Sequence, residues 1–222
     1  GMDETLIKFL ENIVYYALMI VVLLTALGKL GVETTSFLAI LGAAGLAIGL
    51  ALKDSLGNFA SGVMIIMFKP FKVGDVVTAA GVTGSVSEVG IFNSVFTTPD
   101  NQKIIIPNGA ITSGSITNIN AFDTRRVDLV VGIGYEDDIK KTKDVLNDII
   151  SSHEKVLLDK GITVAVSELA DSSVNFVVRA WVKTPDYWDV KFALTETIKL
   201  RFDAEGISIP FPQQDVHHYN KI

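Results

Sequence analysis

The chain has 222 residues, a formal net charge of −6, no cysteine and a mean hydropathy of +0.40. The absence of cysteine excludes disulfide bonds and thiol chemistry, and the acidic balance argues against nucleic acid as the main partner. The hydropathy is high for a soluble domain but too low for a chain that lies wholly in a membrane. We therefore expect two short membrane spans and a soluble region of about 150 residues.

The first apolar run, NIVYYALMIVVLLTALG, is uncharged over residues 12–28 and is long enough for a short transmembrane helix. The charged residues before it are mainly acidic, whereas a cleaved signal peptide begins with basic residues, so we do not expect a signal peptide here. A short link over residues 29–33 predicts a helical hairpin whose two ends face the same side. Lys53, Lys69 and Lys72 follow the second span, and the positive-inside rule places that side in the cytoplasm. We expect a multi-pass protein of the cytoplasmic membrane, with its soluble region in the cytoplasm.

The second apolar run, TTSFLAILGAAGLAIGLAL, covers residues 34–52 and carries small residues in an ordered pattern. On a helical wheel at about 100° per residue, Leu46 and Leu50 share one stripe. Small residues border this stripe on both flanks. The alanine edge holds Ala39, Ala43 and Ala47, and the glycine edge holds Gly42, Gly45 and Gly49.

Two unlike edges on one helix predict a head-to-tail contact between copies, in which the glycine edge of one copy meets the alanine edge of the next. Such contacts close into a ring when the rotation allows, and the leucine stripe then faces the ring axis. A ring of leucines is an apolar constriction that can gate by dewetting. An ordinary membrane anchor and a plain dimer seam remain as alternatives on this pattern alone.

The segment after Leu52 is polar from Lys53 to Asn58 and contains Gly57, and residues 59–68 are apolar again. Ten residues are too few to cross a bilayer, so we expect an interfacial or buried helix that is bent relative to the pore segment. Pro70 predicts its end.

From Phe71 the apolar period changes to two, and glycine-containing turns predict a small β-barrel that ends near Asn118. From Arg125 the pattern predicts β-α-β-β-α-β, the ferredoxin-like plan, with ISIPFPQQDVHHY as its last strand. Asp137 and Asp138 stand where a helix N-cap is needed, and Gly206 stands where a helix must stop.

Motifs for chemistry are missing from the sequence. It contains no nucleophile elbow, phosphate-binding loop or paired-carboxylate motif. It has three histidines. His153 lies late in a predicted helix, where a cation suits the helix dipole, and the pair His217 and His218 has no carboxylate partner at ligand spacing beyond Asp215. We therefore predict that the protein is not an enzyme and that it holds no metal and no cofactor.

Several long segments carry a resemblance to a known family. GVETTSFLAILGAAGLAIGLALKDSLGNFASG (residues 31–62), VMIIMFKPFKVGDVV, KIIIPNGAI and FDAEGISIPFPQQDV resemble the small-conductance mechanosensitive channel family, MscS. The resemblance implies a membrane pore of α-helices and a hollow cytoplasmic vestibule. It also implies a homoheptamer that opens under membrane tension and releases ions and small solutes on hypo-osmotic shock.

The resemblance also implies a domain plan and site residues. The expected parts are a transmembrane helix (1–30), a pore-lining helix with an interfacial extension (31–69), an Sm-like β-domain (70–120), a ferredoxin-like α/β domain (121–209) and a C-terminal β-strand (210–222) that joins a strand barrel. Leu46 and Leu50 fall on the family's two constricting leucines, and the alanine and glycine edges fall on its helix-packing positions. Membrane lipids are expected partners, and nucleic acid is not.

The sequence departs from the family at the end of the pore segment. The best-known members bend the pore helix at a glycine at the position of Asp54, and they have an uncharged residue at the position of Lys53. Here both residues are charged and Gly57 is the nearest glycine, so we expect the bend at Asp54 or Gly57. Rings of Lys53 and Asp54 at the pore mouth either tune ion selectivity or pair between neighbours without measurable effect. A membrane-anchored scaffold or binding module is the alternative function.

Overall fold

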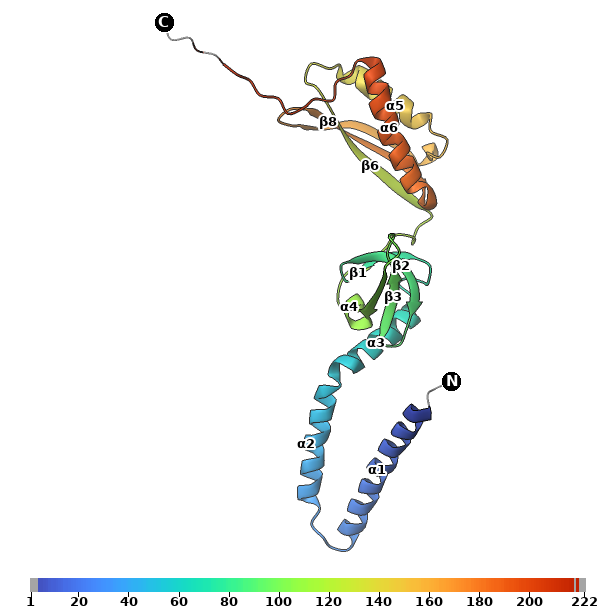
Figure 1. Cartoon of the computed structure of the whole chain (residues 1–222), viewed down its shortest axis with the longest axis vertical. Helices are drawn as coiled ribbons and strands as arrows, with labels where there is room; N and C mark the ends of the chain where they lie inside the picture. The colour runs from blue at the N-terminus through green and yellow to red at the C-terminus, as the bar shows by residue number, and fades with distance from the viewer. Residues whose placement is uncertain (1–3, 218, 220–222) are drawn as a thin grey trace. The chain divides into compact units, whose positions relative to one another are not determined.

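The computed structural model of the chain describes residues 4–217 and 219 (Figure 1). The chain forms two compact units. The first holds residues 4–73, 79–81 and 86–116, and the second holds residues 74–78, 82–85 and 117–217. Strands β1 (Val76–Ala79) and β2 (Val82–Val89) contribute residues to both units.

The chain begins with two apolar helices, α1 (Glu4–Lys29) and α2 (Thr35–Ala51). Glu4 lies in the first turn of α1 and Lys29 in its last, where each charge suits the helix dipole. Residues Ile7–Lys29 form one helix that is long and apolar enough to cross a membrane, and it contains the first predicted span. In the described part of the chain, a second span is present only if α2 and the next helix count as one broken span.

That next helix, α3 (Lys53–Phe68), buries Gly62 and Ile65 and ends at Lys69, which adopts a left-handed conformation with φ 48°. Pro70 follows directly and cannot continue a helix, in agreement with the predicted end.

A five-stranded sheet in the order β4-β3-β2-β1-β5 follows α3. We call this sheet with helix α4 the β-domain. Its elements are β1 (Val76–Ala79), β2 (Val82–Val89), β3 (Asn93–Thr97), β4 (Lys103–Pro107), α4 (Asn108–Thr112) and β5 (Thr117–Asn118). Phe71 and Phe96 are both buried, and their rings meet edge to face with centroids 6.1 Å apart.

The remaining elements form a two-layer α/β domain. They are β6 (Thr124–Ile133), α5 (Ile139–Ser151), β7 (Ile162–Leu169), β8 (Val174–Lys183) and α6 (Tyr187–Glu205), with short 3₁₀ turns at Leu158–Lys160 and Thr184–Asp186. The strands are antiparallel in the order β6-β8-β7, and every second residue of β8 is buried. Helices α5 and α6 both lie on one face of the sheet (Figure 1). Leu146, Phe176 and Phe202 belong to the core between the helices and this face.

One predicted element is not formed. A ferredoxin-like plan ends with a strand beside the first strand, here β6, but residues 207–217 form no strand. Pro210 and Pro212 have no N–H to donate to a ladder, so this segment cannot pair regularly with β6. The predicted C-terminal strand barrel involves several copies and stays a prediction; His218 and residues 220–222 lie outside the described residues.

Candidate pore helix and its anchor

Helix α2 exposes the leucine stripe that the sequence predicts as a gate. Leu46 is 65% exposed and Leu50 is 64% exposed, and the two residues lie one turn apart on the helix. No residue of α2 is buried by the rest of the described chain. An apolar helix without an intramolecular partner must be covered by lipid or by another protein chain.

The predicted glycine edge is also open. A Cβ atom added at Gly42, Gly45 or Gly49 would meet no atom of the described chain within 4 Å. These glycines therefore serve no close contact inside one chain. Small residues of this kind allow the backbone of another helix to approach closely.

The pore helix bends earlier than we expected. Helices α2 and α3 meet at Leu52 with an angle of 58° between them. Asp54 lies in the first turn of α3, and Gly57 lies inside that helix with nothing within 4 Å of an added Cβ. The break in this structure therefore stands two residues before Asp54 and five residues before Gly57, and a bend at either of these residues stays a prediction. Contacts further along α3 hold this helix, and local sequence signals do not reveal them.

Hydrogen bonds join α3 to α4. Asn58 Oδ1 accepts a hydrogen bond from the Gly109 backbone N–H at 2.8 Å. One turn further along, Thr112 Oγ1 donates to Ser61 Oγ at 2.8 Å. These contacts fix the first half of α3 against α4.

A close backbone approach lies beside these hydrogen bonds. A Cβ on Gly62 would lie 2.1 Å from the Ile91 carbonyl oxygen and 2.5 Å from Asn108 Nδ2, so only glycine fits at this position. Asn108 is fully buried and its Nδ2 donates to the carbonyl oxygens of Gly90 and Ile91, both at 3.0 Å. Its Oδ1 accepts from Ser94 Oγ at 2.8 Å. Asn108 therefore links α4, the turn before β3 and the packing surface for α3.

Sequence reasoning missed the roles of Asn58 and Asn108. The one signal in the sequence is the PNG segment at residues 107–109, which carries the family resemblance but does not indicate hydrogen bonds. A buried asparagine is visible as a network only when the strands and helices around it are placed.

The charged residues at the start of α3 are exposed. Lys53 and Asp54 line a cleft of about 380 Å³ together with Asn58, Pro107 and Gly109. The cleft follows the α3–α4 contact, so a charge change here lies next to the anchor of the pore helix.

Among the described residues, no group of three or more histidine and acidic side chains could hold a metal ion. His153 accepts a hydrogen bond at Nδ1 from the Lys155 N–H at 3.3 Å and so belongs to a local turn.

Comparison with known proteins decides the family. Over 222 residues the chain is 48% identical to the small-conductance mechanosensitive channel of Edwardsiella ictaluri. The aligned region covers 100% of this chain and 78% of that protein. The chain belongs to the MscS family. Three family models match the chain: mechanosensitive ion channel, transmembrane helices 2/3, over residues 12–53; mechanosensitive ion channel, β-domain, over residues 54–121; and mechanosensitive ion channel MscS, C-terminal, over residues 127–209.

Solved structures agree with this assignment. The closed-state crystal structure of MscS from Helicobacter pylori is 34% identical, has a TM-score of 0.91 and covers 100% of this chain and 88% of that one. Arabidopsis thaliana MSL1 shares the fold at 21% identity, with a TM-score of 0.80 and coverage of 94% and 78%. The MscS resemblance and the fold class predicted from the sequence are therefore confirmed, and the family is one of membrane channels rather than enzymes.

Proposed function

We propose that this MscS-family chain forms a channel that opens under membrane tension and releases ions and small solutes on hypo-osmotic shock. The observation that carries the proposal is the exposed surface of α2. Its leucine stripe is exposed, and a Cβ added on its glycine edge would meet no other part of the described chain within 4 Å. A helix with this surface is suited to a pore in which neighbouring copies supply the missing contacts.

The proposed assembly is a homoheptamer, as the family resemblance implies. Gly42, Gly45 and Gly49 of one copy would receive the alanine edge of the next copy in a head-to-tail contact. Seven such contacts close the ring around the leucine stripe. The ring would lie in the cytoplasmic membrane with lipids around it, and the soluble domains would extend into the cytoplasm as a vestibule.

The proposed gate is a pair of apolar collars. Leu46 and Leu50 are four residues apart, which places their collars about 6 Å apart along the axis. Water in a narrow apolar neck lacks hydrogen-bond partners, so the closed neck is dry without being sterically plugged. Tension favours the state that occupies more membrane area, and that state must tilt or rotate α2 and widen both collars.

The anchor of α3 gives this movement a fixed end. Asn58, Ser61 and Gly62 hold α3 against α4 and the turn before β3, whereas the described part of the chain buries no residue of α2. A change in the orientation of α2 would therefore be concentrated at Leu52, where the helix is already broken.

We further propose that the soluble domains are architectural. They would form a vestibule with side openings through which solutes reach the pore, with no substrate turnover. The exposed charges of Lys53 and Asp54 at the pore mouth would either select ions or neutralise each other between copies. The reversal potential of Lys53→Gln and Asp54→Asn channels in a salt gradient separates these alternatives, because only a selecting ring makes it shift.

An osmotic assay tests the proposed function. Cells that lack their own tension-gated channels and express this chain should survive a sudden dilution of the medium and release small solutes within seconds. Cells that carry an equal amount of membrane-inserted protein but lyse like the empty-vector control would contradict a release function and favour a membrane-anchored scaffold.

A further inference from the structure

The C-terminal segment leaves α6 through a tightly fixed joint. Gly206 caps the helix in the left-handed conformation with φ 70°, and the Ile207 N–H returns to the Phe202 carbonyl oxygen at 2.9 Å. Lys141 of α5 also reaches this joint, since its Nζ donates to the Glu205 carbonyl oxygen at 2.6 Å. The end of α6 is therefore held from two sides.

One carboxylate fixes the next residue of the segment. Asp137 Oδ2 accepts hydrogen bonds from the Ser208 N–H at 3.0 Å, from Ser208 Oγ at 2.6 Å and from the Gly134 N–H at 2.9 Å. The Gly134 N–H also donates to the Ser208 carbonyl oxygen at 3.2 Å. Hydrogen bonds to an ionised acceptor are stronger than neutral ones, so this group is a firm attachment. We call Gly134, Asp137 and Ser208 the tail clamp.

The tail clamp corrects a prediction from the sequence. Asp137 and Asp138 were both expected at the N-cap of the following helix. The N-cap of α5 is Asp138, whose Oδ1 accepts from the N–H groups of Lys140 at 2.7 Å and Lys141 at 3.0 Å. The carboxylate of Asp137 is left free for a long-range contact with Ser208, 71 residues away.

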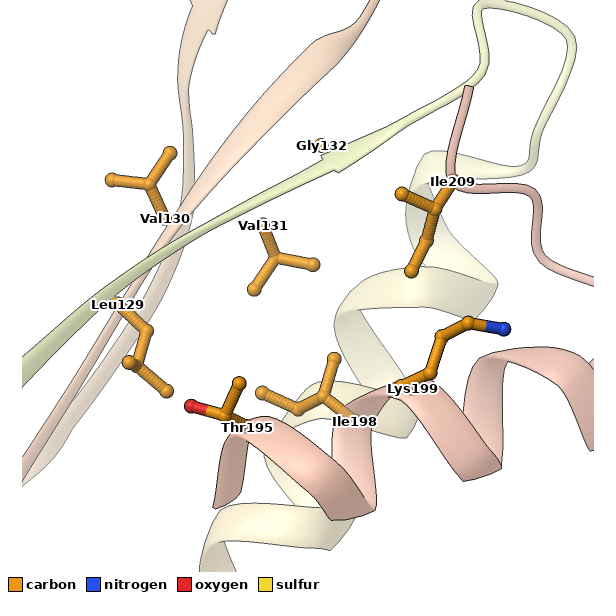
Figure 2. A pocket seen from close by; sticks show the side chains of 8 residues that line it. All are labelled: Leu129, Val130, Val131, Gly132, Thr195, Ile198, Lys199 and Ile209. Atoms are coloured by element: carbon orange, nitrogen blue, oxygen red, sulfur yellow. The ribbon is translucent and has the colours of Figure 1, made fainter. Parts of the chain in front are cut away.

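An apolar side chain follows the clamp. Ile209, which is 45% exposed, lies at one end of a groove of about 230 Å³ between β6 and α6, near Val131, Ile198 and Lys199 (Figure 2). From Phe211 to residue 217 the segment is exposed: Phe211 is 83% exposed, and the Gln213 N–H donates to Ser172 Oγ at 3.1 Å. The chain thus presents an extended segment with apolar and polar side chains from a fixed base.

We propose that Asp137 is a positioning residue that sets the direction in which the C-terminal segment leaves the α/β domain, and that this direction lets the segments of neighbouring copies meet. The second part rests on the proposed function, because it requires a ring of copies. An extended segment that pairs with other copies must be directed toward them, and a joint already held by hydrogen bonds lowers the entropy lost when the segments assemble.

The absence of cysteine makes the clamp directly measurable. A nitroxide label on Phe211→Cys in the full-length protein reports the motion of the segment by electron paramagnetic resonance. Asp137→Ala should make this label clearly more mobile, and Asp137→Asn should give an intermediate spectrum because its amide oxygen still accepts hydrogen bonds. Gly134→Ala should act in the same direction, since its added Cβ would lie 2.5 Å from Ser208 Oγ.

Two controls separate the clamp from general damage. Asp138→Ala removes the neighbouring N-cap and should leave the Phe211→Cys label unchanged. A label on Leu158→Cys, far along the chain in an exposed turn, should not respond to Asp137→Ala. The proposed clamp is refuted if the label at position 211 is equally mobile with Asp137→Ala and with Asp137 unchanged. It is also refuted if Asp138→Ala increases the mobility of this label as much as Asp137→Ala does.

Native mass spectrometry tests the second part of the proposal. If the unmodified protein is a ring, Asp137→Ala should dissociate from it at lower detergent concentration than Asp138→Ala does. Equal dissociation of the two variants would refute the role in assembly. If the unmodified protein is a monomer, the role in assembly fails with the proposed function, and the mobility measurement still decides whether Asp137 directs the segment.

Discussion

Asn58 and Gly109 are joined across two helices, since the Asn58 side-chain oxygen accepts a hydrogen bond from the Gly109 N–H at 2.8 Å. The bond ties α3 to the start of α4 only six residues after the break at Leu52. Only six residues therefore separate the exposed helix α2 from the point at which α3 is held, so a rotation of α2 must be taken up by this short stretch. This relationship makes the packing around α3 a sensitive place for substitutions.

Gly62→Ala should destabilise the protein, because the added methyl group would lie 2.1 Å from the Ile91 carbonyl oxygen. Overpacking of this kind costs about 1–3 kcal/mol. The matched control is Gly57→Ala in the same helix, where the methyl group meets nothing within 4 Å and helix propensity favours alanine by up to about 1 kcal/mol. Thermal unfolding of the purified protein should give a lower midpoint for Gly62→Ala and an unchanged or higher one for Gly57→Ala.

Leu46→Ser and Leu50→Ser should produce channels that leak at rest or open at lower tension. A hydroxyl group lets water stay in the closed neck, which lowers the free energy of a conducting state. Growth of the expressing cells should slow, and their resting potassium content should fall. Phe37→Ser is the control, because on the helical wheel it lies on the opposite side of α2 from the leucine stripe. A leak from Phe37→Ser as large as that from Leu46→Ser would remove the leucine stripe as the gate.

Gly49→Leu should weaken the ring by separating neighbouring pore helices. Outside its own helix, no atom of the described residues lies within 4 Å of a Cβ added at Gly49, so a larger side chain fits within one chain. Ala44→Leu adds bulk on the back of the same helix and should be tolerated. Native mass spectrometry in mild detergent should show fewer rings for Gly49→Leu than for Ala44→Leu. A dimer or monomer as the main species of the unmodified protein would exclude the head-to-tail ring.

Asp138→Ala should lower the stability of the α/β domain and change how that stability depends on pH. Hydrogen bonds from the N–H groups of Lys141 and Lys140 lower the pKa of the Asp138 carboxyl below its ordinary value of 3.8. A lowered pKa in the folded state contributes stability that is present above pH 3.8 and is lost as pH falls through the folded-state pKa. Urea unfolding should give a free energy of unfolding at pH 7 and at pH 3, and the difference between these two values should be smaller for Asp138→Ala than for the unmodified protein. An equal difference in both proteins would show that this cap does not contribute to acid sensitivity.

Much of the fold could be predicted because its signals are local. The apolar run at residues 12–28, the change to a period of two after Phe71 and the cap at Asp138 each depend on neighbours in the sequence, and the structure contains the corresponding helix, strands and N-cap. The small residues of the pore segment could likewise be placed on helix faces from their spacing alone.

The features that the sequence does not reveal concern contacts between distant residues. Ten residues after the break at Leu52, Gly62 packs on the turn at Ile91, and a helical wheel contains no information on that contact. The use of Asp137 likewise depends on Ser208, and both contacts follow from tertiary packing and not from the pattern around each residue. The missing fourth strand is different, because Pro210 and Pro212 are visible in the sequence and argue against a regularly paired strand.

The most direct test is current recording from membrane patches that contain only the purified protein. The account predicts no current at rest, then discrete current steps whose open probability rises steeply with suction and falls when suction is released. Leu50→Ser should shift the same curve to lower tension. Patches that contain the assembled protein and stay silent up to membrane rupture, or that conduct equally at every tension, would contradict a tension-opened pore gated by Leu46 and Leu50.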